Sequence, residues 1–148
     1  MSYRVYATDD LHLEIEQKLN RIFRILVAKD MYYEAMYLAF LRDTGYRQQE
    51  IQNIRWRNID QEGVLSNVPS SKPGESICNS RQLNTDTIIA LRQWDFADPD
   101  ALLFPKTTSL LRRICTVTSE KLTYTELKRY AQQRLCERYI TTPKNWPN

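Results

Sequence analysis

Residues 31–42 restrict the fold of this chain more than any other segment. All of them except Glu34 and Arg42 are apolar or aromatic, and neither proline nor glycine interrupts them. A helix of this composition is apolar on nearly every side, which is typical of a helix buried among other elements. We therefore expect residues 31–42 to form the central helix of the core, and Gly45 to end it.

The segment before this helix has the pattern of an amphipathic helix over residues 9–29, with Asp9 and Asp10 as the N-terminal cap. Its apolar side chains recur at helical spacing, at Leu11, Ile15, Leu19, Ile22 and Leu26. After Gly45 we expect four more helices, over residues 47–57, 85–94 (capped by Asn84 or Thr85), 108–117 and 123–140.

A change of composition after Gly63 predicts a small β-hairpin. Residues 64–68 have strand character, residues 69–75 contain the Pro, Ser, Lys and Gly of a turn, and residues 76–80 can return as a second strand. The predicted class is α+β and mostly helical, with about six helices and one small antiparallel hairpin or sheet. The length of 148 residues favours one domain, over residues 1–148.

Composition excludes several other classes of protein. The mean hydropathy is −0.58 and no long uncharged apolar run occurs, so we expect a soluble, cytoplasmic protein without a membrane partner. Cys78, Cys115 and Cys136 are widely spaced, and His12 is the one histidine. This spacing predicts neither a disulfide framework nor a zinc site, and we expect no cofactor.

Basic charge is concentrated in the last third of the chain. Residues 106–148 hold nine Lys and Arg against three Glu, a formal charge of +6, whereas residues 1–105 sum to −3. Such an asymmetry suits a polyanionic partner, and a solvated basic helix face is the alternative explanation.

Arg47 is the first residue that carries candidate chemistry. It is predicted in the first turn of its helix, on the face of Ile51 and Ile54, so its side chain should point inward. An inward guanidinium needs a partner, which is either a bound anion such as phosphate or a carboxylate such as Glu50 or Asp60.

The residues around Arg47 resemble the first signature of the tyrosine recombinases, or phage integrases. The matching string is Thr44-Gly45-Tyr46-Arg47, then Glu50-Ile51, Ile54, Trp56 and Ile59-Asp60. The family segment reads T-G-x-R-x-x-E-[IL]-x-x-L-x-W-x-D-[IV]-D, and its arginine clamps the scissile phosphate, a role that the resemblance gives to Arg47. The family's hairpin lysine, which assists protonation of the leaving group, would correspond to Lys72; an exposed turn lysine is the alternative.

The second family signature, H-x-x-R on a late helix, is matched in apolar pattern but not in chemistry. Thr125 stands where the family has His, and Lys128 stands where it has Arg. Threonine does not act as an acid or base near neutral pH, and lysine cannot form the bidentate phosphate clamp of arginine. The resemblance covers residues 10–140 and implies the catalytic-type domain of the family.

The family's nucleophilic tyrosine and its N-terminal core-binding domain have no counterpart that we recognise. Tyr139 is eleven residues after Lys128, or about 16 Å along a continuous helix, whereas in-line attack requires about 3 Å. We therefore read Tyr139 as a packing residue, and we expect the chain to begin directly with the catalytic-type fold.

The expectation that follows is a catalytically inactive recombinase-like protein that binds duplex DNA or modulates recombination. Its phosphate contacts would be Arg47, Lys72, Lys128 and Arg129, with Arg55, Arg57, Arg112 and Arg113 as flanking charges. One alternative is a protein-interaction module, a partner of an active recombinase or of a second copy, without DNA binding. A second is an active strand-transfer enzyme with a displaced nucleophile.

Overall fold

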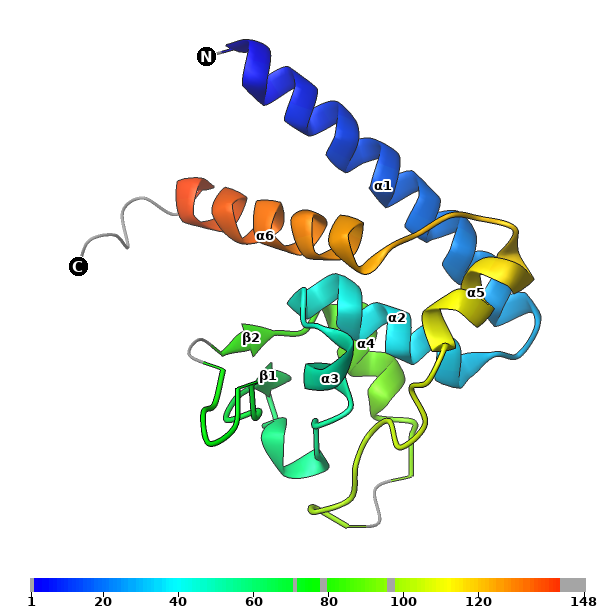
Figure 1. Cartoon of the computed structure of the whole chain (residues 1–148), viewed down its shortest axis with the longest axis vertical. Helices are drawn as coiled ribbons and strands as arrows, with labels where there is room; N and C mark the ends of the chain where they lie inside the picture. The colour runs from blue at the N-terminus through cyan, green and yellow to red at the C-terminus, as the bar shows by residue number, and fades with distance from the viewer. Residues whose placement is uncertain (1, 71, 78–79, 96–97, 142–148) are drawn as a thin grey trace.

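The described residues form six α-helices, one short 3₁₀ helix and one two-stranded antiparallel sheet (Figure 1). The structure is a computed structural model that describes residues 2–70, 72–77, 80–95 and 98–141, with side chains described between residues 11 and 134. The elements are α1 (Ser2–Ala28), α2 (Tyr32–Thr44), α3 (Gln48–Ile51), η1 (Trp56–Asn58), β1 (Val64–Leu65), β2 (Arg81–Gln82), α4 (Thr85–Leu91), α5 (Leu110–Thr118) and α6 (Tyr124–Thr141). The predicted mostly helical α+β class is confirmed.

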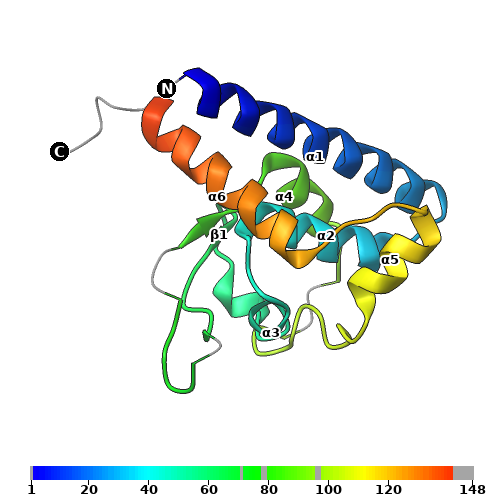
Figure 2. The ribbon, with the colours of Figure 1, turned by 45° about the horizontal axis from the view of Figure 1, so that its top comes forward.

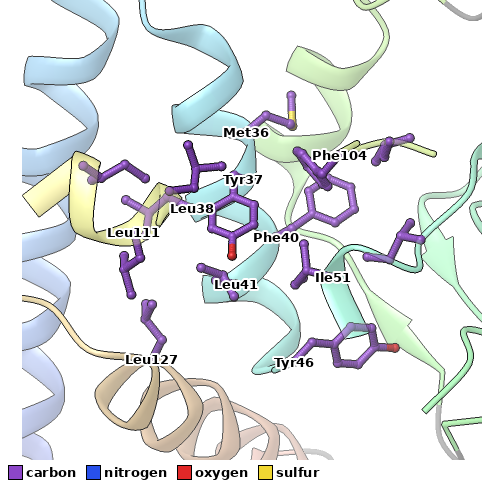
Figure 3. Close-up of a cluster of buried hydrophobic side chains, with 14 of the residues drawn as sticks. Met36, Tyr37, Leu38, Phe40, Leu41, Tyr46, Ile51, Phe104, Leu111 and Leu127 are labelled. Carbon is purple, nitrogen blue, oxygen red and sulfur yellow. The ribbon is translucent and has the colours of Figure 1, made fainter. Parts of the chain in front are cut away.

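Helix α2 is the centre of the core, as its composition predicts. Ten of its 13 residues are buried, and its side chains pack toward Leu111 on one side and Phe104 on the other (Figure 3). Phe104 meets Phe40 and Tyr37 edge to face, with ring centroids 5.2 and 5.6 Å apart. Such aromatic pairs add about 0.5–1.5 kcal/mol each beyond the area that they bury.

Helix α1 covers α2 through its C-terminal half. Leu19, Ile22 and Leu26 are buried there as predicted, but Leu11 is 60% exposed. The helix begins at Ser2, so the predicted cap at Asp9 is wrong; an acidic pair is compatible with a helix interior when nothing else stops the helix.

Helix α6 lies across α2 in both ribbon views (Figures 1 and 2). Leu127 and Ala131 of α6 are buried, and the hydroxyls of Tyr37 and Tyr124 are 2.7 Å apart. Tyr130, also buried, stacks on His12 of α1 with ring centroids 4.3 Å apart. The predicted helix over residues 123–140 is confirmed within one residue at each end.

The predicted helix over residues 47–57 is wrong. Helix α3 stops at Ile51, and the chain then pairs with a distant loop: the carbonyl of Ile54 accepts the N–H of Leu103 at 2.9 Å, and Trp56 donates its N–H to the carbonyl of Ala101 at 3.2 Å. Backbone groups used in this way cannot also bond within a helix. Ile51 and Ile54 are nevertheless fully buried, as predicted.

The predicted hairpin forms with a different return strand. Val64 pairs with Gln82 and Leu65 pairs with Arg81, so the second strand lies after residues 76–80 rather than within them. Nearer the turn, Ile77 donates its N–H to the carbonyl of Val68 at 2.8 Å. Asn84 is the N-cap of α4 as expected, but α4 ends at Leu91, three residues early, whereas α5 is within two residues of its predicted bounds.

No helix among the residues that the structure describes combines the length and the apolar character needed to cross a bilayer.

Candidate nucleic-acid interface

The turn after α2 is held in a fixed shape by its own side chains. Thr44 donates its hydroxyl to the carbonyl of Phe40 at 2.6 Å and accepts the N–H of Tyr46 at 3.1 Å. Gly45 caps the helix in the left-handed conformation, at φ 70°, and its N–H bonds to the carbonyl of Leu41. The positive φ is one that glycine adopts without steric cost, which explains why the helix ends at this residue.

Gly45 is also the point where α6 touches this turn. A Cβ at Gly45 would be 2.9 Å from the Cβ of Ala131 and 3.7 Å from the Cα of Lys128. The backbone of α6 therefore packs on the bare glycine, and Lys128 lies beside the turn that carries Arg47. The two segments that resemble the family signatures thus meet in space, although Gly45 and Lys128 are far apart in the sequence.

Arg47 is exposed, which corrects the expectation that it points inward. It is the N-cap of α3 rather than a residue of its first turn, because its N–H bonds to Oε1 of Glu50 at 2.8 Å. With four residues, α3 is too short to supply a useful macrodipole for an anion. In the part of the chain that the structure describes, neither Arg47 nor Lys128 forms an ion pair with a carboxylate.

Arg81 is a third cation at this turn, and it is not among the residues predicted from the sequence. Its Nε donates to the carbonyl of Thr44 at 3.3 Å, and its guanidinium lies 5.6 Å from the ring centroid of Tyr46. Burial raises the pKa of Tyr46 to about 12, although Arg81 acts in the opposite direction. A basic residue just after a predicted return strand was the one feature of the sequence that pointed to Arg81.

The positions of the second signature lie at the start of α6. Thr125 is exposed and Lys128 is half-buried, and both lie beside Leu127, which is buried. Tyr139 lies on the same continuous helix, about 16 Å further along its axis. Its side chain is outside the described residues.

The other predicted cations are spread over several elements. Lys72 is exposed in the hairpin turn, Arg129 lines a cleft between α1 and α6, and Arg112 is exposed on α5. Arg113 is also exposed, and it forms an ion pair with Glu34, with 3.7 Å between Nε of the arginine and Oε2 of the glutamate.

Arg55 and Arg57 share a second, smaller hollow of about 240 Å³ beside η1. Arg57 forms an ion pair with Asp100 at 2.7 Å, and Arg55 donates to the carbonyl of the same residue. Asp100 therefore offsets much of the positive charge there, and this pair contributes less to an anion-binding surface than the sequence suggested.

The buried charges of the core form a separate network. Arg42 bonds to Asp43 at 2.8 Å, Thr87 at 2.9 Å and Asp86 at 3.1 Å, and Thr87 in turn donates to Asp43 at 2.7 Å. These contacts satisfy a buried guanidinium, so we assign Arg42 to stability rather than to the candidate site.

Comparison with protein-family models, with curated proteins and with solved structures finds no match for this chain. The described residues hold no group of three or more His, Cys, Asp or Glu side chains that could bind a metal ion.

Proposed function

We propose that this protein has a tyrosine recombinase-like fold and binds the backbone of duplex DNA without performing strand transfer. Arg47, Lys128 and Arg81 would contact phosphate around the turn at Gly45, and Lys72 and Arg129 would extend the basic surface. A role beside an active recombinase and a cytoplasmic location belong to the same proposal.

The observation that carries the proposal is the packing of α6 on Gly45. The resemblance assigns Arg47 and Lys128 to one phosphate site, and this contact brings the backbone of Lys128 against the turn that precedes Arg47. Two cations without carboxylate partners in the described structure can exchange their counterions for phosphate, which is the main source of sequence-independent affinity for DNA.

The residues at the reacting positions do not suit strand transfer. A threonine at position 125 supplies no proton near neutral pH, and Lys128 binds phosphate as a point charge. The axial distance from Lys128 to Tyr139 is also too long for in-line attack within one chain.

Fluorescence anisotropy with a short labelled duplex at two salt concentrations tests the proposal. We expect affinity to fall steeply as salt rises, and to fall about three- to tenfold at low salt in Arg47→Ala and in Lys128→Ala. Lys29→Ala is the matched control. It removes an exposed lysine before the N-terminus of α2, whereas Arg47 follows its C-terminus, about 20 Å away along the helix.

Equal losses in all three variants would mean that the whole surface binds DNA weakly without a site at Gly45. No binding by the wild type at low salt would overturn the DNA-binding proposal.

A second candidate function, a protein-interaction module, is favoured by one specific observation. Val27, Tyr32 and Ile89 are each at least half exposed, and all three line one groove between α1, α2 and α4. Exposed apolar side chains that gather in one hollow are typical of a surface that another molecule covers.

A further inference from the structure

The groove between α1, α2 and α4 has the size and lining of a binding site. Its volume is about 800 Å³, large enough for several side chains of a ligand. Most of its wall is apolar. The apolar side chains include Phe23 and Val27 of α1, Met36 of α2, Ile89 of α4, and Trp94 just after α4.

The walls of this groove determine which backbone conformation a peptide can adopt in it. The described residues that line it belong to α1, α2 and α4 or, for Gln93 and Trp94, to the turn just after α4, and none of them lies on a strand. Backbone groups within the helices bond internally. An extended peptide would find no backbone partners there, whereas a helix satisfies its own hydrogen bonds and can present an apolar face.

One end of the groove is polar and carries a net negative charge. Arg42 and Asp86 are the charged residues of its lining. Arg42 is already paired with buried Asp43 as well as with Asp86, so the three groups together sum to −1. The side chain of Asp86 is 70% exposed and can accept further hydrogen bonds, whereas Asp43 is fully buried.

We propose that this groove binds an amphipathic helix of a partner protein whose apolar face ends in a lysine or arginine that pairs with Asp86. The inference rests on the second candidate function and names the chemistry of its partner. Exposed apolar walls select the apolar face, and the exposed carboxylate of Asp86, which shares Arg42 with Asp43, selects the basic residue.

Labelled helical peptides of about four turns test the proposal. Each carries one leucine stripe and a single lysine beyond one end of the stripe, in two versions with the lysine at either end. Matched peptides carry glutamine or glutamate in its place. We expect one lysine peptide to bind about threefold tighter than its glutamine version and about tenfold tighter than its glutamate version at low salt.

Two variants of the protein locate the site. Ile89→Arg should weaken binding of the lysine peptide at least tenfold, because it places a cation on the apolar wall of the groove. Leu13→Arg is its control, since Leu13 is 51% exposed but does not line the groove. Asp86→Asn should make the lysine and glutamine peptides bind equally, with the melting temperature measured alongside to show that the variant is folded.

The possible outcomes distinguish the charged helix partner from a plain apolar docking site, from self-association and from DNA binding. Equal binding of all peptides, lost in Ile89→Arg, would overturn the charged partner while leaving an apolar docking site. No peptide binding by the folded wild type would overturn both, and dimerisation of the protein that Ile89→Arg abolishes would identify a second copy as the occupant. Arg47→Ala should leave peptide binding unchanged, so failure of the DNA proposal does not affect this test.

Discussion

Gly45 combines two requirements that no other residue type meets at its position. Its φ of 70° ends α2, and its missing side chain allows the backbone of α6 to approach. Gly74 has a similar φ of 77°, but a Cβ there would have no neighbour within 4 Å. The two glycines therefore separate the conformational effect of a side chain from its steric effect.

We predict that Gly45→Ala lowers the free energy of unfolding by about 2–4 kcal/mol and Gly74→Ala by about 1 kcal/mol. The left-handed conformation costs each alanine about 1 kcal/mol, and the overlap with Ala131 adds about 1–3 kcal/mol at Gly45 alone. Urea denaturation of both variants measures the difference. Equal losses would show that α6 does not pack on this turn.

The raised pKa of Tyr46 should make the stability of the protein fall at alkaline pH. Its pKa in the folded protein is raised to about 12 by burial, against about 10 in an unfolded chain, so folding favours the neutral phenol. Its contribution is fully present below pH 10 and is lost as pH rises toward 12, by on the order of 2 kcal/mol. We expect Tyr46→Phe to lose less stability than the wild type between pH 10 and 12, measured by urea denaturation at each pH. Exposed Tyr32→Phe is the control and should change this pH dependence less.

At the scale of elements, α2 and α6 are joined by a pair of hydroxyls with unequal surroundings. Tyr37 is fully buried, whereas Tyr124 is half-buried, and their oxygens are 2.7 Å apart. Loss of its partner would therefore leave the Tyr37 hydroxyl inside the core, whereas Tyr124 keeps part of its surface exposed to solvent. A buried hydroxyl without a partner is costlier than an exposed one.

We predict that Tyr124→Phe costs about 1–3 kcal/mol of stability and Tyr37→Phe only about 0.5–1.5 kcal/mol. The double variant should cost less than the two single variants together, by about 0.5–1 kcal/mol. Chemical denaturation of the four proteins completes the cycle. Strict additivity would mean that the two hydroxyls do not interact in solution.

The elements also show where prediction from sequence succeeded. Residues 31–42 and 123–140 became α2 and α6 because their apolar patterns are long and regular. Residues 47–57 have the same periodicity at Ile51 and Ile54, yet the helix ends at Ile51. Residues 54–56 instead pair with residues 101–103, and both isoleucines are as fully buried as they would be on the inner face of a helix. Local periodicity does not contain that distant partner.

At the scale of the whole molecule, two different surfaces carry the two proposed activities. The cations around Gly45 suit a polyanion, and the apolar groove of Val27, Tyr32 and Ile89 suits a protein segment. The charge asymmetry along the sequence fits the first surface only in part. Lys128 and Arg129 come from the basic last third, whereas Arg47 and Arg81 come from the acidic part of the chain.

We predict that the protein forms no covalent adduct with a nicked duplex that traps strand-transfer intermediates, because no proton donor stands at position 125 and Tyr139 is about 16 Å along α6 from Lys128. Denaturing electrophoresis after incubation detects such an adduct. An adduct that disappears in Tyr139→Phe but persists in Tyr32→Phe would show an active enzyme with a displaced nucleophile.

The sequence by itself determined the mostly helical class, the buried central helix, the turn at Gly45 and the late helix over residues 123–140, because each depends on residues within one or two turns of each other. Only the tertiary structure decided that Arg47 is exposed, that Arg81 lies over Tyr46, and that α6 rests on Gly45. The physical reason is that the direction of a side chain depends on which distant segment takes the space beside it. That choice is made by the packing of the whole chain rather than by its local pattern.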